Sequence, residues 1–596
     1  MKRTIVFLTG IAGAIIFFLA VFPLPLQADY KYDYYDYQEM VTLLKDLETQ
    51  AASKNPNVYS LQVIGYSYQN NPIYAVKFSD NPDQEEDDEP DVVIDGGIHG
   101  NEWLPVDSNL NFIQYLFDAY YNDTHPDHDE VVDLVNNFEI WIIPMINVDG
   151  RIRDDLNHGD PDSFWIDTTY HAGDNVGWRM NVQEVDCPAM PDSTNQGIDI
   201  NRTFSYKFWE LSDCTKTTYN GGTAFAAPES RVLKDFINNH MVSLLLHQHS
   251  NLQVIYGASD TTGLGDYISL EADTIYDEGL PNPLMALTNG IEFLTGGASA
   301  VRHESKDGRV SPQKGSGVCG GSVYSGQYFE WLWEEIDCIL APDNHSRRAI
   351  QNIFYEYAYI EYTEPQYAYM NVYGYIDDGK VGQHERDDGS NGFHPSSGAM
   401  NQWIIEKSVE MNKYLIKQSR YPFSPRYHAD MSWRPEAPNT DLAIVGAKIS
   451  EVGDGLPGCL TTDTNGRDLL APGTKRITWN VQNNGTGTRT VRTEIEICAV
   501  TVDECSTPFS VTLTKENVPP EKIETFTYEY SFEPLKDYWV TLKTIEAHTW
   551  DDVVTMYNNY VSAQASWSEV ITSYNEYTKP DYENDLKRFV LTTLSD

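Results

Sequence analysis

The stretch that decides the fold is Val92-Val-Ile-Asp-Gly-Gly-Ile-His-Gly-Asn-Glu-Trp103. Its three β-branched residues predict a buried strand, and the paired glycines end that strand in a loop carrying His99 and Glu102. In an open α/β sheet, ligands bind at loops that follow the carboxyl ends of strands. His and Glu three residues apart can supply two zinc ligands, so a third ligand must come from elsewhere in the chain.

A second apolar strand offers that third ligand. It reads Leu244-Leu-Leu-His-Gln-His-Ser250 and carries two histidines near its end. Residues 247 and 249 point to the same side of an extended strand, so periodicity alone does not separate His247 from His249.

The surrounding chain, from about Tyr37 to Tyr421, alternates helical and strand-like segments. Apolar residues at helical spacing predict a helix over 38–52, and short apolar runs predict buried strands over 138–146 and 241–246. Such alternation predicts an α/β domain, here over residues 29–435, with a mixed, mainly parallel sheet flanked by helices.

The pattern changes after Pro435. Ile477, Trp479 and Val481 alternate with polar residues, and Asn and Gly supply turns between the alternating segments. Regular alternation broken by turns predicts an antiparallel β-sandwich of the immunoglobulin-like type over 440–567, followed by a C-terminal tail at 568–596. The pattern identifies no ligand for this sandwich.

The amino terminus indicates export. Lys2 and Arg3 precede an apolar run that ends in Leu26-Gln-Ala28, which is typical of a signal peptide over 1–28. An uncleaved anchor is the alternative, because the run reaches the lower limit of a membrane span. We expect a secreted, extracellular protein with no stable membrane span after cleavage. Its seven cysteines are then expected mainly in disulfides, and the odd number leaves one over.

The charge of the chain restricts its partners. With 41 Lys plus Arg against 89 Asp plus Glu, the formal net charge is −48. A field of that sign repels phosphate backbones and anionic lipids, so we expect no nucleic-acid partner. The acidic run at 85–89 predicts a solvated loop, with calcium binding as the alternative.

Several segments, taken in order, resemble one family. The region from about Tyr37 to Tyr421 is similar to zinc metallocarboxypeptidases of the carboxypeptidase A/B type. The matching segments are Ile64–Lys77, Gly97–Trp103, Asn147–Gly150 (with Val148 where the family has proline), Trp178–Arg179, Gly197–Arg202 and Leu246–Ser250.

The resemblance implies a role for each matched residue. It implies one zinc ion per chain, bound by His99, Glu102 and His247, because the first histidine of the His-Gln-His segment is the family's ligand. It implies that Arg179 faces the substrate oxygen that becomes negative, and that Asn201 and Arg202 bind the terminal carboxylate. A guanidinium group matches a carboxylate with two parallel hydrogen bonds. The resemblance also implies a disulfide between Cys187 and Cys214.

The family's last motif matches less closely. The best match is Gly326–Asp343, which places the general base on Asp343, whereas a second register places it on Glu335. Tyr324 corresponds to the family's substrate-capping tyrosine, and Phe329 corresponds to a position in its specificity pocket.

These observations predict a secreted zinc carboxypeptidase that acts on peptide or protein C-termini. Phe329 supplies no charge to the pocket, so we expect a preference for apolar or aromatic C-terminal residues. Two alternatives remain: a weak or inactive relative that binds peptide C-termini, and an amidase acting on cell-wall peptides.

Overall fold

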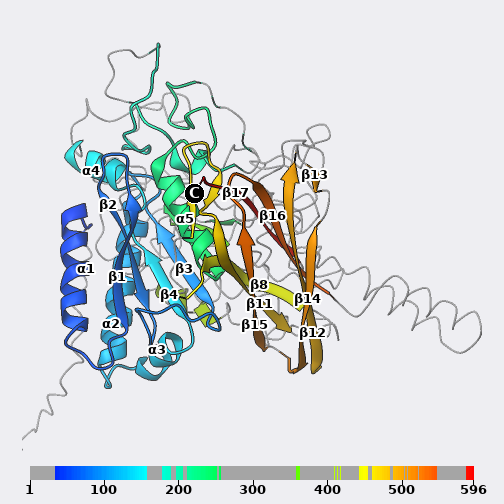
Figure 1. The fold of residues 1–596 in the computed structure, drawn as a ribbon. Helices are drawn as coiled ribbons and strands as arrows, with labels where there is room; N and C mark the ends of the chain where they lie inside the picture. The colour runs from blue at the N-terminus through cyan, green and yellow to red at the C-terminus, as the bar shows by residue number, and fades with distance from the viewer. Residues whose placement is uncertain are drawn as a thin grey trace, which may run out of the picture.

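The structure of the chain is a computed structural model, and its described residues form two domains (Figure 1). The described residues are 34–157, 177–189, 196–205, 208, 211, 213–250, 254–256, 357–362, 408–409, 412–413, 416–417, 442–453, 459–483, 487–501, 504–505, 508–520, 522–545 and 586–595.

The first domain is built on a seven-stranded mixed sheet. Its strand order is β1-β2-β4-β3-β5-β7-β6. The four strands β4, β3, β5 and β7 run parallel, and the outer pairs are antiparallel, which confirms the predicted α/β sheet. The bounds are β1 Tyr59–Tyr66, β2 Pro72–Phe78, β3 Asp91–Gly96, β4 Glu139–Ile143, β5 Val242–Ser250, β6 Val254–Tyr256 and β7 Tyr357–Tyr362.

Helices cover this sheet. α2 packs on β3 and β5, α1 packs on β1, and α5 contacts β1. α1 corresponds to the helix predicted over 38–52, and its apolar stripe is buried as expected from its spacing. The bounds are α1 Tyr37–Ala51, α2 Trp103–Tyr121, α3 His128–Val135, α4 Val148–Asn157, the short 3₁₀ helix η1 Ile200–Arg202 and α5 Pro228–Asn239.

The second domain is a β-sandwich. One sheet has the order β13-β12-β16-β17-β10-β9, with β14 paired to β12, and the other has the order β15-β11-β8. Their facing side chains, including Trp479 and Phe526, form a separate core. The bounds are β8 Leu442–Glu451, β9 Leu460–Thr462, β10 Asp468–Leu470, β11 Gly473–Asn483, β12 Arg489–Thr501, β13 Glu504–Cys505, β14 Phe509–Val518, β15 Ile523–Phe532, β16 Asp537–Thr544 and β17 Leu586–Thr593.

The structure corrects the predicted end of the sandwich. β17 lies within the segment expected to be a tail at 568–596, yet it pairs with β16 along its length and with β10. Phe589 and Leu591 alternate with outward residues and enter the sandwich core. The β10–β17 pair is parallel, so among the described pairs of the sandwich it departs from the antiparallel prediction.

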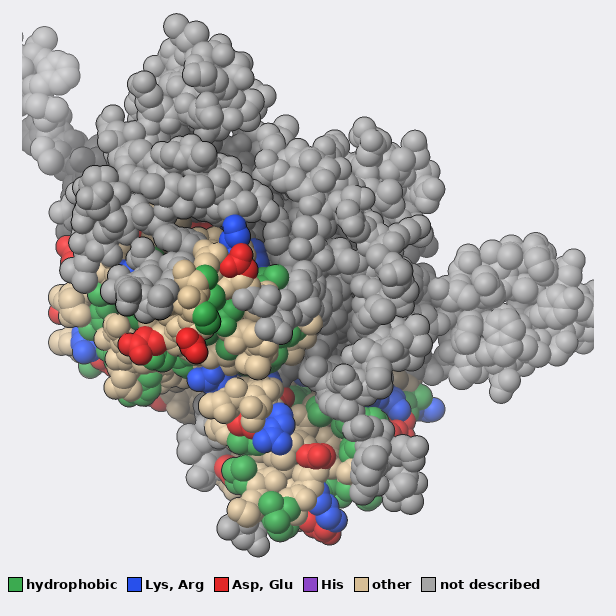
Figure 2. Space-filling model, turned by 90° about the horizontal axis from the view of Figure 1, so that it is seen from above, with side chains coloured by type: hydrophobic (Ala, Val, Ile, Leu, Met, Phe, Trp, Pro, Cys, Tyr) green, Lys and Arg blue, Asp and Glu red, His purple; other side chains and the backbone are tan. Residues whose placement is uncertain are grey.

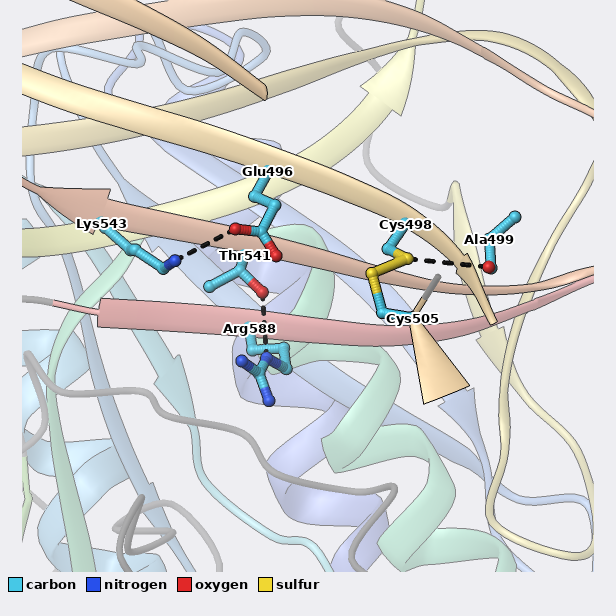
Figure 3. Close-up of a disulfide and its surroundings, with 7 residues drawn as sticks. All are labelled: Glu496, Cys498, Ala499, Cys505, Thr541, Lys543 and Arg588. Carbon is cyan, nitrogen blue, oxygen red and sulfur yellow. Dashed lines mark hydrogen bonds and ion pairs between the residues drawn. A yellow bond between two sulfur atoms is a disulfide. The ribbon is translucent and has the colours of Figure 1, made fainter. Parts of the chain in front are cut away.

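The larger sheet of the sandwich carries a disulfide. Cys498 of β12 is bonded to Cys505 of β13 beside the Glu496–Lys543 ion pair, while Arg588 donates to Thr541 across β16 and β17 (Figure 3). Cys459 is a buried free thiol, in keeping with an odd number of cysteines.

The two domains meet through a polar interface centred on the end of α5. The side chain of Asn239 donates to the carbonyl of Leu460 at 2.8 Å and accepts from the amide of the same residue at 3.0 Å. Lys234 pairs with Asp468 at 3.0 Å, and Thr462 donates to Asp235. The sandwich is thus hydrogen-bonded to the first domain rather than merely linked to it along the chain.

The acidic run at 85–89 lies at the same interface, which corrects its prediction as a solvated loop. Lys448 of β8 pairs with Asp87 at 2.6 Å, and Asn480 of β11 donates to the carbonyl of Asp87 at 2.7 Å. Glu86 and Glu89 bring carboxylate oxygens within 4.8 Å of those of Asp80, and burial raises the pKa of Glu89 to about 8. Part of the negative charge of the run is therefore balanced by Lys448 of the sandwich.

Candidate metal and substrate site

The loop after β3 places His99 and Glu102 in the interior of the domain. Both side chains are buried, and Nδ1 of His99 lies 2.6 Å from Oε1 of Glu102. The loop packs tightly because Gly100 donates to the carbonyl of Arg179 at 3.0 Å. A Cβ at position 100 would lie 2.5–2.7 Å from backbone atoms of Gly150 and Trp178, so only glycine fits there.

The end of β5 brings a histidine to this pair. The donor atoms of His99, Glu102 and His249 all lie within 4.8 Å of one another, and Nδ1 of His249 lies 2.9 Å from Oε2 of Glu102. Two imidazole nitrogens and a carboxylate are the ligand types that zinc prefers at a catalytic site.

His247, which the family resemblance favours as the third ligand, has a different partner. Its Nδ1 lies 2.5 Å from Oδ1 of Asp95, the residue that faces it across the β3–β5 pairing. His249 lies two residues further along β5, beyond the last β3–β5 pair at Gly96 and Gln248. The described geometry therefore brings His249, not His247, to His99 and Glu102.

The charge states around Glu102 suit a metal site. Although burial opposes ionisation, His99 and His249 hold the pKa of Glu102 well below its usual range. Burial lowers the pKa of His249 well below its usual range. Metal binding requires an ionised carboxylate and neutral imidazoles. The neighbouring histidines favour the ionised state of Glu102, and burial favours the neutral state of His249.

Arg179 lies beside this cluster, as the resemblance implies. Its Nε donates to Oδ2 of Asp199 at 3.0 Å, and its Nη1 lies 3.7 Å from Glu102. Oδ1 of Asp199 lies 3.3 Å from Nε2 of His99. Despite complete burial, Arg179 and Arg202 hold the pKa of Asp199 well below its usual range. Asp199 thus joins the arginine to a predicted metal ligand.

Sequence reasoning did not single out Asp199 as a site residue. It lies inside the quoted segment Gly197–Arg202, so its position in a family motif was the available signal. Asp95 was also not singled out. It lies in the quoted segment before the glycines, and its contact with His247 arises only from the pairing of β3 with β5.

The predicted carboxylate-binding pair lies shortly after Asp199, with Ile200 between them. Asn201 and Arg202 lie in η1, whose amino end is capped by Asp199 accepting from the amide of Asn201 at 3.0 Å. Both side chains are buried, and Arg202 donates to the carbonyl of Asn201 at 2.8 Å.

A disulfide between Cys187 and Cys214 brackets this region and confirms the predicted pairing. The remaining predicted site residues, Tyr324, Phe329, Glu335 and Asp343, lie outside the described residues. The structure therefore brings together the metal cluster and both arginines, and it does not address the base, the capping tyrosine or the pocket.

Comparison with known proteins defines the class. Residues 44–305 match the sequence profile of the family described as zinc carboxypeptidase. The matched region holds the cluster and both arginines, so this part of the chain is similar to zinc carboxypeptidases.

Individual relatives cover smaller shares. A zinc carboxypeptidase of Saccharothrix mutabilis subsp. capreolus is 33% identical over 175 residues, covering 29% of this chain and 33% of that protein. Carboxypeptidase B of Bos taurus is 25% identical over 213 residues, covering 34% and 43%. The chain thus spans less than half the length of these relatives.

Two further similarities were found. An inactive metallocarboxypeptidase of Blastomyces gilchristii (strain SLH14081) is 28% identical over 218 residues, covering 34% of this chain and 32% of that protein. The solved bovine thrombin-activatable fibrinolysis inhibitor in complex with tick carboxypeptidase inhibitor is 17% identical, with a TM-score of 0.40, covering 65% of this chain and 98% of that one.

The described surface adds two observations. On the face seen in Figure 2, acidic and basic side chains are interspersed over the described part, and no extended patch of Lys and Arg gathers there. Among the described residues, none of the helices is both long and apolar enough to cross a bilayer.

Proposed function

We propose that this chain is an exported zinc-dependent carboxypeptidase that removes C-terminal residues from peptides. The observation that carries the proposal is the buried cluster of His99, Glu102 and His249 with Arg179 beside it. Arg202 follows Asp199 in the same segment and supplies a second cation near the cluster. A metal-ligand set next to two arginines suits a substrate with a carbonyl to polarise and a free carboxylate to bind.

The ligand set fits zinc. His99 and Glu102 would hold it together with one histidine of β5: the geometry favours His249, and the family motif favours His247. When bound, zinc supplies a Lewis acid and lowers the pKa of a bound water to roughly 7.

Arg179 has the geometry of a group that stabilises negative charge. Asp199 fixes its guanidinium by accepting from Nε, and Nη1 lies 3.7 Å from Oε1 of Glu102, so the cation is held beside the metal-ligand set. Its side chain is 22% exposed, so the cation lies at the edge of the interior rather than inside it. A preorganised donor at the position where negative charge develops contributes more than one in bulk water.

Asn201 and Arg202 would bind the terminal carboxylate. Asp199 orders their backbone through the cap of η1, so the clamp and Arg179 are held by the same carboxylate. We propose Asp343 as the general base, with Glu335 as the alternative, Tyr324 as the residue that covers the bound substrate, and Phe329 as part of a pocket for apolar or aromatic side chains.

A second candidate function is a peptide-binding protein without turnover. Two observations favour it: an inactive metallocarboxypeptidase is among the relatives, and the sequence places an aspartate or a shifted glutamate at the base position. Loss of a positioned base typically slows catalysis by ~10²–10⁴-fold.

Hydrolysis of amino-blocked dipeptides by the purified full chain separates these functions. We expect turnover of substrates with a free C-terminal carboxylate, loss of turnover on chelation, and recovery on adding zinc. Substrates ending in Phe or Leu should be cleaved faster than those ending in Lys or Arg. Arg202→Met should raise KM for the free acids and leave the cleavage of amidated substrates equally low.

Three results would change the assignment. Faster cleavage of Lys or Arg substrates would reject the apolar pocket. Equal cleavage of acids and amides would reject the carboxylate clamp and favour an amidase. Tight binding of the free acids by the zinc-loaded chain, with no turnover of any substrate, would favour the binding protein.

A further inference from the structure

Glu229, at the start of α5, is a buried carboxylate outside the metal cluster and the carboxylate clamp. Its side chain has no exposure to solvent. Oε1 accepts from the backbone amide of Tyr68 at 3.0 Å, and Oε2 accepts from Nδ2 of Asn181 at 2.9 Å. A buried carboxylate is costly unless it is hydrogen-bonded, so both contacts matter to its placement.

Asn181, which contacts Glu229, is also hydrogen-bonded to the segment that contains Asp199. Its Oδ1 accepts from the amides of Ile198 at 2.9 Å and Gln183 at 3.1 Å, and its own amide donates to the carbonyl of Ile198 at 3.0 Å. A Cβ at Gly197 would lie 2.2 Å from the carbonyl oxygen of Asn181. The two segments are therefore in direct backbone contact, and a side chain at position 197 would push them apart.

These bonds set the spacing between Arg179 and Asp199. Arg179 lies two residues before Asn181, and Asp199 follows Ile198 directly. The carbonyl of Arg179 accepts from Gly100 at 3.0 Å, which fixes the other side of the segment to the loop that holds His99. The contact of 3.0 Å between the guanidinium of Arg179 and the carboxylate of Asp199 thus lies between two sets of backbone hydrogen bonds, one to Gly100 and one to Ile198.

We propose that Asn181 and Glu229 are positioning residues that hold Arg179 in register with Asp199 and the metal cluster. The proposal rests on the proposed function, because it assigns these residues to the step in which Arg179 faces the developing negative charge. Neither residue is placed in contact with the substrate. Their effect is on orientation, and a displacement of about 1 Å in a catalytic group can cost ~10²-fold in rate.

Reversal of the hydrogen-bond polarity tests the pair. Asn181→Asp places a carboxylate against Oε2 of Glu229, and the two acceptors repel. Adding Glu229→Gln restores the contact, because the new amide can donate to the carboxylate introduced at position 181 while its carbonyl oxygen still accepts from Tyr68. Asn136→Asp, an exposed position at the end of α3, is the control for an added negative charge.

We expect Asn181→Asp to lower kcat by ~10–10²-fold with KM changed by less than about threefold, and with normal zinc content. The double variant should recover kcat to within about threefold of the unmodified chain. Affinity for a phosphonate dipeptide, which imitates the negatively charged transition state, should fall and recover in parallel. The control variant should match the unmodified chain in every measurement.

The same measurements can overturn the proposal. If the double variant is as slow as Asn181→Asp, or if the loss of rate follows loss of zinc or of folded protein, the pair does not position Arg179. If the unmodified chain shows no turnover, the proposed function fails on its own. Phosphonate affinity then decides the inference: equal affinity in all four proteins rejects it, and a loss restored in the double variant supports it.

Discussion

Asn239→Ala should destabilise the whole chain, because Asn239 makes two hydrogen bonds between the domains. Its side chain is 5% exposed and bonds both backbone groups of Leu460, which is fully buried. The substitution removes both of these bonds, together with the bond that Nδ2 donates to the carbonyl of Asp235 within α5 at 2.7 Å. It leaves the amide and the carbonyl of Leu460 without those partners at an interface that water reaches poorly.

The magnitude follows from those two groups. A buried backbone donor or acceptor left unsatisfied costs ~1–3 kcal/mol, so two of them bound the effect at ~2–6 kcal/mol. A water molecule admitted into the vacated volume would restore part of the bonding. We therefore expect a loss of about 3 kcal/mol in the free energy of unfolding.

Urea unfolding of the full chain, followed by tryptophan fluorescence, measures this loss in both domains. Trp141 is buried in the first core and Trp479 in the second, so unfolding of either domain changes the signal. We expect the transition to shift to lower urea, with Asn136→Ala, an exposed change at the end of α3, staying within ~0.5 kcal/mol of the unmodified chain. A shift for Asn239→Ala no larger than that of the control would refute the reasoning.

Three further predictions concern the site and the interface. In cobalt-loaded variants, His249→Cys should give a near-ultraviolet thiolate-to-metal band and His247→Cys should not; the reverse pattern would support the family motif over the described geometry. Arg179→Ala should lower kcat by ~10²–10³-fold with unchanged zinc content, and a change of less than threefold would exclude it from stabilising the developing charge. Burial, with Asp468 nearby, raises the pKa of Asp235 to about 6, above its unfolded value near 3.9. The folded chain therefore binds more protons than the unfolded chain, and stability should fall as pH rises from about 4 to 6. Asp235→Asn keeps an acceptor for Thr462 and should flatten that part of the stability profile; an unchanged slope would contradict this assignment.

Local pattern was enough to predict much of the fold. The apolar stripe over 38–52 predicted α1, because a helix buried on one face carries apolar residues at helical spacing. The apolar runs at 138–146 and 241–246 predicted β4 and β5, because strands buried on both faces carry continuous apolar runs. Alternation likewise predicted the sandwich. It missed β17, whose Phe589 and Leu591 are flanked by charged and polar residues and acquire partners only through long-range pairing.

The sequence by itself determined the chemistry of the site: His99, Glu102, Arg179 and Arg202 lie in motifs whose residue types and spacing are local. Tertiary structure decided which groups meet. Residues 247 and 249 share one side of a strand, so only the pairing of β5 with β3 sets His247 against Asp95 and His249 against Glu102. The sequence predicts that the acidic run at 85–89 is solvated, because nothing near it in the chain indicates its partner. The fold brings Lys448, more than 350 residues away, to Asp87. Contacts between segments far apart in the chain leave no periodic trace in either segment, and for that physical reason only the folded structure shows them.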